Sequence, residues 1–301
     1  MRGRERWLAL AALIGIGALW GLGAPLVRFA RLEGMATFSI VFWQAAVGLV
    51  VIALVQGVRG RLAIPLDRAS LALYAAVGML GIVLPHLAGY WALGHIPAFA
   101  HALLTSLVPI FALTLALGLR IERFDGLRAL GIVMGALAVA LLIVPQGSLP
   151  DTVPVVFVLV SALAPLCYAV ESAYVAHVSR ARAGALQALL GGSVVAVAVM
   201  APLTWAADAP VWPEGLSPAL GAITASGLSA ALAYAGYVAL LRRAGSVFAT
   251  QVAYLVTGWA MIWSILFLAE RPSSWVWLAM ATLFLGLFLV QPRPKLPVID
   301  P

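Results

Sequence analysis

The chain is long enough for one or two soluble domains, but its composition excludes a soluble protein. Of its 301 residues, 64% are hydrophobic and 10% are charged, whereas soluble globular domains carry about 25% charged residues. The single cysteine, Cys167, excludes a disulfide framework and a zinc site built on several thiolates. The net charge of +7 comes from basic residues scattered over short connections, so it indicates membrane topology rather than nucleic-acid binding.

Apolar segments of about 20 residues recur along the whole chain, and each can cross a hydrocarbon core of about 30 Å. We predict helices, because lipid-exposed backbone must satisfy its own hydrogen bonds and the segments lack the alternation of barrel strands. The first segment follows three arginines but is too long for a typical signal sequence, so we predict that it stays as a helix. The ten predicted spans cover residues 7–29, 36–57, 69–93, 96–118, 126–145, 153–176, 183–206, 218–241, 245–268 and 273–291.

The basic residues favour one orientation of these spans. Of the 18 Lys and Arg residues, 15 fall on one side of the membrane and three, Arg28, Arg31 and Arg271, on the other. Positively charged connections are retained in the cytoplasm. We therefore predict a multi-pass protein of the inner (plasma) membrane with both termini in the cytoplasm.

The sequence also repeats itself. The stretch at 88–93, AGYWAL, returns at 235–240 as AGYVAL with an offset of 147, and Glu122-Arg123 returns as Glu270-Arg271 with an offset of 148. Both offsets place a span over the span five positions later, which indicates a duplicated five-helix unit. Because five is odd, the second copy enters from the opposite side. The predicted fold is therefore an all-α membrane protein with a 5+5 inverted-topology repeat: halves at 7–145 and 153–291, then a disordered tail at 292–301.

Short motifs accompany this repeat. They are Leu19-Trp20-Gly21 in the first span, Leu107-Val108-Pro109 in the fourth, and the acidic residues that follow spans four and nine, Glu122 and Glu270. Together with the repeat, they resemble the EamA-type members of the drug/metabolite transporter superfamily. The resemblance implies a central cavity surrounded by spans 1–4 and 6–9, with spans 5 and 10 outside. It also implies transport of amino acids, other metabolites or toxic compounds.

Glu171 is the only acidic residue well inside a predicted span. Intramembrane charges are costly and are therefore functional candidates until a partner explains them. Tyr168 lies one turn before Glu171 on a polar stripe. We expect both to bind substrate and Glu171 to take up a proton during turnover; the alternative is a structural acid that reaches toward Arg180 or Arg182.

Histidines and aromatic residues supply further candidates for substrate binding. His86 and Tyr90 are four residues apart and share a helix face, and His86 is a second candidate for proton coupling. His101 is expected to line the same cavity, and Trp20 and Tyr90 could form aromatic walls for a flat or cationic solute. For each of these side chains, plain packing between helices is the alternative.

The ninth span carries a second predicted site. Gln251 and Tyr254 fall on one face, which mirrors Ser106 in the fourth span. Pro85, Pro109 and Pro165 lie inside spans and are expected to kink them for gating. Two Gly-x-x-x-Gly pairs, starting at Gly17 and Gly131, allow close helix contact within or between protomers.

Other classes of protein fit less well. The only lysine is Lys295, so the chain lacks a nucleotide-binding phosphate loop, and no set of paired catalytic groups indicates an enzyme. No cofactor or metal site is expected, and the oligomeric state stays open. A channel or structural membrane protein remains an alternative to a carrier.

The scarcity of cations inside the spans narrows the solute, since phosphorylated solutes need buried Lys or Arg. We therefore predict a secondary transporter for small neutral or zwitterionic metabolites such as amino acids, with export as the direction that the family resemblance implies. Efflux of cationic or amphipathic drug-like compounds is the alternative.

Overall fold

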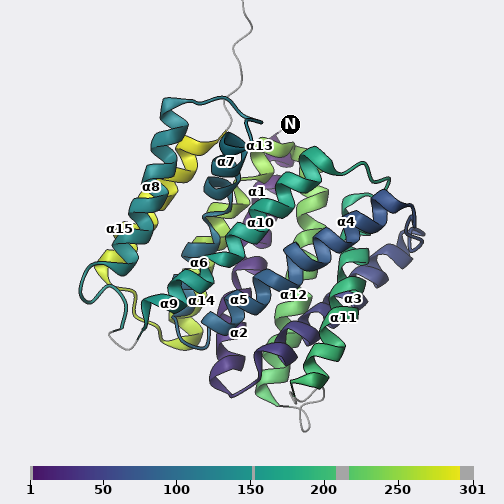
Figure 1. Cartoon of the computed structure of the whole chain (residues 1–301), viewed down its shortest axis with the longest axis horizontal. Helices are drawn as coiled ribbons and strands as arrows, with labels where there is room; N and C mark the ends of the chain where they lie inside the picture. Colours follow the sequence, from purple (N-terminus) through teal and green to yellow (C-terminus); the bar gives the residue numbers. More distant parts are fainter. Residues whose placement is uncertain (1–2, 151–152, 208–216, 292–301) are drawn as a thin grey trace, which may run out of the picture.

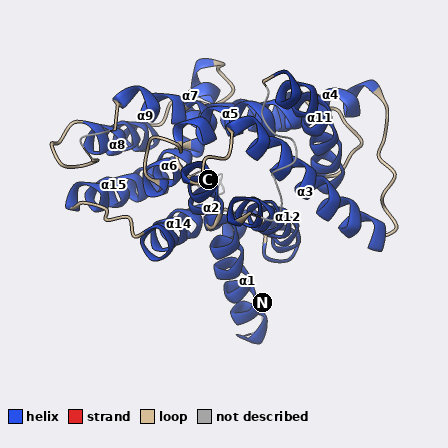
Figure 2. Cartoon of the chain, turned by 90° about the horizontal axis from the view of Figure 1, so that it is seen from below, coloured by secondary structure: helices blue, strands red, loops and turns tan. Residues whose placement is uncertain are grey.

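The computed structural model describes residues 3–150, 153–207 and 217–291, and within these ranges every regular element is a helix (Figure 2). Eight helical stretches there are long and apolar enough to cross a membrane, and two shorter apolar helices, Val252–Leu268 and Ser274–Val290, complete ten spans. The predicted class and number of spans are therefore confirmed. The predicted disordered tail, residues 292–301, lies outside the described residues.

We number the spans 1 to 10 in chain order. In the first half, span 1 is α1 (Gly3–Gly21) with α2 (Gly23–Leu32), and span 2 is α3 (Thr37–Val58). Span 3 is α4 (Arg68–Gly78) with η1 (Met79–Val83) and α5 (Leu84–Ala92). Span 4 is α6 (Ala98–Thr105) with α7 (Val108–Gly118), and span 5 is α8 (Gly126–Ile143). In the second half, span 6 is α9 (Val155–Ser161) with α10 (Leu163–Ala173) and η2 (Tyr174–Val178). Span 7 is α11 (Ala185–Ala206), and span 8 is α12 (Pro218–Ala244). Span 9 is α13 (Ser246–Ala249) with α14 (Val252–Leu268), and span 10 is α15 (Ser274–Val290). Spans 1 and 8 each run three residues beyond the predicted end, so Arg31 belongs to a helix rather than a loop.

Polar side chains precede the first residue of several of these helices. Asp67, Asp125 and Ser217 precede α4, α8 and α12, and each accepts a hydrogen bond from the amide three residues further on. Such caps satisfy backbone donors that a helix leaves unpaired at its start. The hydroxyl and amide of Ser70 hold the pKa of the Asp67 carboxyl below its ordinary value.

Prolines explain where three spans are interrupted. A proline cannot donate to the carbonyl four residues before it, and its ring crowds that carbonyl. The residues four before Pro25, Pro109 and Pro165 are the last residues of α1, α6 and α9. Spans 1, 4 and 6 are therefore each built from two helices. Pro202 lies within α11 without dividing it.

Pro85 acts differently on span 3. The carbonyl four residues before it belongs to Gly81, and here the helix widens to a π-helical turn over Met79–Val83 instead of breaking. The Leu84 amide donates to the Met79 carbonyl, five residues earlier. A π-turn keeps the helix continuous while it adds one residue to the turn. Each of the three predicted kink prolines therefore coincides with an irregular segment, while their role in gating stays a prediction.

The helix contacts follow the repeat. The α1 helix of the first half packs against α14 and α12 of the second half, and its counterpart α10 packs against α7 and α5 of the first half. In the same way α3 packs against α12, and α11 packs against α4. Each contact is thus reproduced when every span is shifted by five, as expected for an inverted repeat. Spans 5 and 10, α8 and α15, lie side by side at one edge of the molecule, opposite α3, α4 and α11 (Figure 1).

Glycines allow the closest of these contacts. A Cβ atom on Gly21 would lie 2.8 Å from the Trp259 Cβ in α14, and one on Gly131 would lie 2.8 Å from the Gly286 carbonyl oxygen in α15. Helices that meet at glycine bring their backbones close enough for extensive van der Waals contact. Both predicted Gly-x-x-x-Gly pairs therefore pack helices within the chain.

Candidate functional site

A series of pairwise contacts across α5, α10, α12 and α1 links five predicted site residues. The His86 ring stacks on the Tyr90 ring with centroids 4.6 Å apart. Tyr168 is within electrostatic range of both Tyr90 and Glu171. These five residues and Tyr234 of α12 form a group that we call the central cluster. Its members are Trp20, His86, Tyr90, Tyr168, Glu171 and Tyr234.

Tyr234 of α12 joins the two sides of the central cluster. It is within electrostatic range of Glu171, and its ring meets the Trp20 ring edge-on with centroids 6.3 Å apart. Tyr237, one turn further along α12, lies against the same indole at 5.7 Å. The predicted aromatic wall at Trp20 therefore has two tyrosines of the other half as its partners.

The Tyr90 hydroxyl is already used within the protein. It donates to the Gln44 side-chain oxygen, and the Gln44 amide nitrogen donates to the Ser226 hydroxyl at 2.7 Å. Gln44 and Ser226 are buried in α3 and α12. The chain of hydrogen bonds ties spans 2, 3 and 8 together, so Tyr90 presents its ring rather than its hydroxyl to the rest of the central cluster.

The two predicted histidines differ in their partners. His101 is buried, its Nδ1 lies 2.8 Å from the Ser161 hydroxyl, and its Nε2 lies 3.4 Å from the Thr105 hydroxyl. His86 Nδ1 is buried and has no hydrogen-bond partner within the described part of the chain. His101 therefore has the surroundings of a structural hydrogen-bonding group, whereas His86 keeps one ring nitrogen for a solute or a proton.

Glu171 lies against the backbone of span 3. A Cβ atom on Gly81 would lie 2.7 Å from Glu171 Oε2 and 2.8 Å from both Oε1 and Cδ. Over residues 3–150, 153–207 and 217–291, the ion pairs are Arg28–Glu270 and Arg128–Glu122, and neither includes Glu171. The alternative interpretation, in which Arg180 or Arg182 neutralises this carboxylate, finds no support among these ion pairs.

Three further predicted residues lie at the break in span 4 and near the start of α14. Ser106 hydrogen-bonds to Thr257 across the two halves, at the break between α6 and α7. Gln251 precedes α14 at the break after α13. Tyr254 packs edge-on against Phe284 of α15 and accepts a hydrogen bond from Gln291 at 3.1 Å. Ser106 and Tyr254 therefore have partners of their own, in α14 and around α15.

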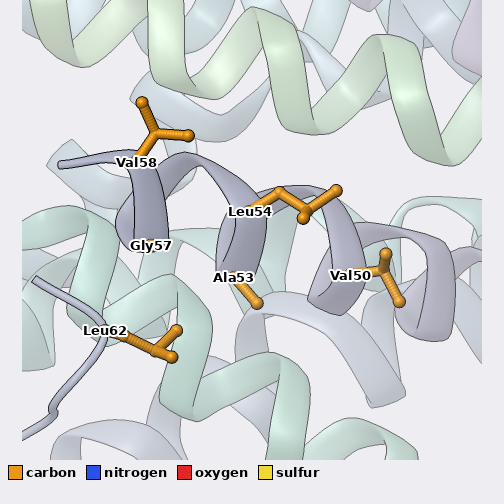
Figure 3. Close-up of a pocket in the computed structure, with 6 residues that line it drawn as sticks. All are labelled: Val50, Ala53, Leu54, Gly57, Val58 and Leu62. Atoms are coloured by element: carbon orange, nitrogen blue, oxygen red, sulfur yellow. The ribbon is translucent and has the colours of Figure 1, made fainter. Parts of the chain in front are cut away.

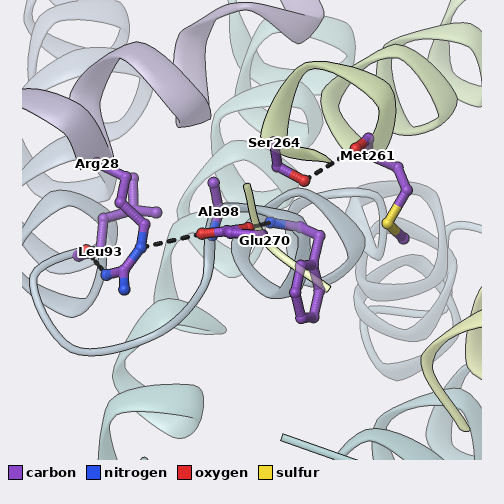
Figure 4. A network of polar contacts seen from close by, with 7 residues as sticks. Arg28, Leu93, Ala98, Met261, Ser264 and Glu270 are labelled. Atoms are coloured by element: carbon purple, nitrogen blue, oxygen red, sulfur yellow. Dashed lines mark hydrogen bonds and ion pairs between the residues drawn. The ribbon is translucent and has the colours of Figure 1, made fainter. Parts of the chain in front are cut away.

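A different polar group joins the halves at one end of the bundle (Figure 4). The Arg28 side chain donates to Glu270 at 3.0 Å and to the Leu93 carbonyl at 2.7 Å. Glu270 also accepts from the amides of Ala98, at 2.8 Å, and Phe99, at 3.3 Å. Burial raises the pKa of the Glu270 carboxyl, and the two amides and the Arg28 guanidinium oppose that rise. Glu270 therefore caps α6, whose preceding residue offers no side-chain cap.

The hollow in Figure 3 lies elsewhere, on the outer side of α3. Apolar residues and one glycine line it: Val50, Ala53, Leu54, Gly57, Val58 and Leu62. Leu54 and Val58 are 65% and 91% exposed, as suits side chains that face lipid. The hollow offers no polar side chain to orient a solute, so it is not the candidate site.

Sequence reasoning missed several residues of the site. Gly81 is one of 28 glycines, and only the folded chain shows that Glu171 lies over it. Gln44 and Ser226 are far apart in sequence and meet through the packing of α3 on α12. Tyr237 carried a signal, because it is the counterpart of Tyr90 in the repeated AGY motif.

The ten helical spans and the family match together identify a membrane transporter. The model of the EamA-like transporter family matches residues 7–144 and 155–291. The chain therefore belongs to the EamA-like transporter family, and it is a transporter rather than an enzyme. A protein known from a crystal structure shares the fold, with a TM-score of 0.63 over 93% of this chain and 95% of that chain at 19% sequence identity. No curated protein matches the chain.

Proposed function

We propose that the protein exports small neutral or zwitterionic metabolites, amino acids among them, by alternating access between the two sides of the membrane. The observation that carries the proposal is Glu171, an acidic side chain inside span 6 that belongs to neither ion pair of the described residues. An uncompensated acid within a membrane bundle is costly and marks a solute or proton path. A solute ammonium or a proton supplies the missing positive charge, and His86 is the second candidate for carrying a proton.

The arginines of span 1 favour this class of solute over an anionic one. Arg28 is paired with Glu270, and the Arg31 guanidinium donates to the Met35 carbonyl at 2.6 Å. Both residues lie in α2, close to the end of the span, and neither pairs with Glu171. Phosphorylated solutes need such cations beside them, whereas an amino acid can place its ammonium group at Glu171.

The aromatic rings favour a second candidate function, efflux of cationic or amphipathic drug-like compounds. Tyr168 and Tyr234 interact with Glu171, and Tyr90 and Trp20 extend the central cluster on either side of them. Aromatic faces attract cations and cover flat apolar solutes. The same cluster would accept an amino acid with an aromatic side chain, so the two candidates differ mainly in whether the solute carries a carboxylate.

The proposed location is the inner membrane with both termini in the cytoplasm. It rests on the distribution of Lys and Arg, 15 on one side and three on the other. Reporter domains fused to the two ends should both report the cytoplasm, and a split result would contradict this orientation.

Counterflow in proteoliposomes tests the proposed function. Vesicles loaded with one unlabelled compound at a time should accumulate a labelled amino acid when the two share the carrier, and uptake should saturate with concentration. Glu171→Gln should reduce this exchange by at least about fivefold, whereas Glu122→Gln, at an exposed position, should leave it unchanged. Exchange only with cationic compounds would favour the second candidate, and unsaturable flux would indicate a channel. Normal exchange by Glu171→Gln would remove this residue from the mechanism.

A further inference from the structure

We propose that Gly81 is a positioning residue for transport: by having no side chain, it lets the Glu171 carboxyl lie directly against span 3. The proposal rests on the proposed function of Glu171 and adds what determines where that carboxyl sits. It also assigns a role to a residue that touches no solute.

The contact has a definite geometry. The position of a Gly81 Cβ would be 2.7, 2.8 and 2.8 Å from Oε2, Oε1 and Cδ of Glu171. Three nearly equal distances mean that the carboxyl group lies with its flat face toward Gly81. The lone pairs of a carboxylate lie in the plane of the group, so this contact leaves them to face hydrogen-bond donors from elsewhere.

The backbone around Gly81 departs from a regular α-helix, as it often does at functional sites. Gly81 is the middle residue of the π-helical turn Met79–Val83, and Pro85 four residues later cannot donate to its carbonyl. π-helical turns are frequent at functional sites because they shift side chains relative to a regular helix. Two helical turns along the same span, a Gly89 Cβ would lie 2.6 Å from His101 Cε1. Span 3 thus omits a side chain at two places where a polar side chain from another span reaches it.

An alanine at position 81 should move the carboxyl without unfolding the protein. Ordinary contact with a Cβ begins at 3.4 Å, so the nearest carboxyl oxygen, at 2.7 Å, has to retreat by about 0.7 Å. The group that moves is the far end of a flexible side chain, and the backbones of α10 and span 3 need not separate. Displacements on the order of 1 Å at a reacting or binding group can cost up to about 100-fold in rate.

The experiment compares Gly81→Ala with Gly48→Ala in the proteoliposome assay. Gly48 lies in α3, where an added Cβ has no atom within 4 Å, so its substitution should leave transport unchanged. We expect Gly81→Ala to lower the transport rate by about tenfold at normal expression and monodispersity. Glu171→Asp, which withdraws the carboxyl by one methylene from an intact Gly81, should lower it as well.

The double variant Gly81→Ala/Glu171→Asp separates positioning from packing. The shorter side chain clears the new methyl group, so the double variant should transport better than the product of the two single effects predicts. A defect caused only by helix packing would not be relieved in this way. Strictly multiplicative effects, wild-type transport by Glu171→Asp, or wild-type transport by Gly81→Ala would each overturn the proposal.

Failure of this inference is distinguishable from failure of the proposed function. If Glu171→Gln is impaired while Gly81→Ala behaves like Gly48→Ala, only the role of Gly81 is refuted. If Glu171→Gln transports normally, the proposed function of the carboxyl fails first.

Discussion

Glu270 joins the two halves of the protein, and we expect Glu270→Ala to be far more destabilising than the same change at its repeat counterpart, Glu122. Glu270 accepts hydrogen bonds from Arg28, at 3.0 Å, and from the first two amides of α6, at 2.8 and 3.3 Å. The side chains of Arg28 and Glu270 are 17% and 10% exposed. Glu122 pairs with Arg128 at the same distance, 3.0 Å, but its side chain is 46% exposed.

The magnitude follows from what each substitution leaves behind. Removing one partner of a buried ion pair costs about 3–5 kcal/mol, because the other charge stays shielded from water. Glu270→Ala also leaves two helix-terminal amides without an acceptor. We therefore expect a loss of about 3–5 kcal/mol in the free energy of unfolding. An exposed ion pair contributes about 0–1 kcal/mol, which is the loss we expect for Glu122→Ala.

Unfolding in mixed detergent micelles, followed by tryptophan fluorescence, measures both losses under the same conditions. Glu270→Gln serves as the intermediate case, since it keeps an acceptor oxygen but removes the charge. We expect the order of stability to be wild type, Glu122→Ala, Glu270→Gln and Glu270→Ala. Equal losses for the two alanine variants would refute the reasoning, because they would show that burial of the Glu270 pair has no energetic consequence.

Two further predictions concern helix packing and a buried hydrogen bond. Gly131→Ala places a Cβ 2.8 Å from the Gly286 carbonyl, whereas Gly126→Ala in the same helix meets nothing within 4 Å. We expect a loss of about 1–3 kcal/mol for the first and none for the second, and equal thermal midpoints would contradict the assigned contact. Gln44→Leu removes the acceptor of Tyr90 and the donor to Ser226, so unfolding should become easier by about 1–3 kcal/mol; unchanged stability would show that both hydroxyls find other partners.

The spans and their duplication were predictable because they depend on local sequence. A lipid-exposed helix needs only length and apolar character, and both are readable without tertiary contacts. The interruptions of spans 1, 4 and 6 were also predictable in principle, since they fall four residues before Pro25, Pro109 and Pro165. The break before α14 has no such signal, because the ninth span lacks a proline within it.

The candidate site was less predictable, because helix faces in a membrane are weakly marked by polarity. A continuous helix would present Tyr254 and Gln251 on one face, but the chain breaks at Thr250 and Gln251 and the phenol ring of Tyr254 packs toward α15. Glu171 stood out in the sequence because acids are rare inside spans. Its contact with Gly81 could not be predicted, since it depends on how α10 packs against span 3.

The two ends of the bundle are closed in different ways, although one duplicated unit built both. The positions 147 and 148 residues after Arg28 are Val175 and Ala176, and neither carries a charge. Glu122 therefore has no counterpart of Arg28 to bind in the other half, and it pairs with Arg128 of its own half. Separation of the halves at the Glu270 end has to break the Arg28–Glu270 pair, whereas the Glu122–Arg128 pair lies within one half and stays intact when the other end opens. The empty transporter should consequently spend unequal times open at its two ends, because the Arg28–Glu270 pair favours closure of one of them.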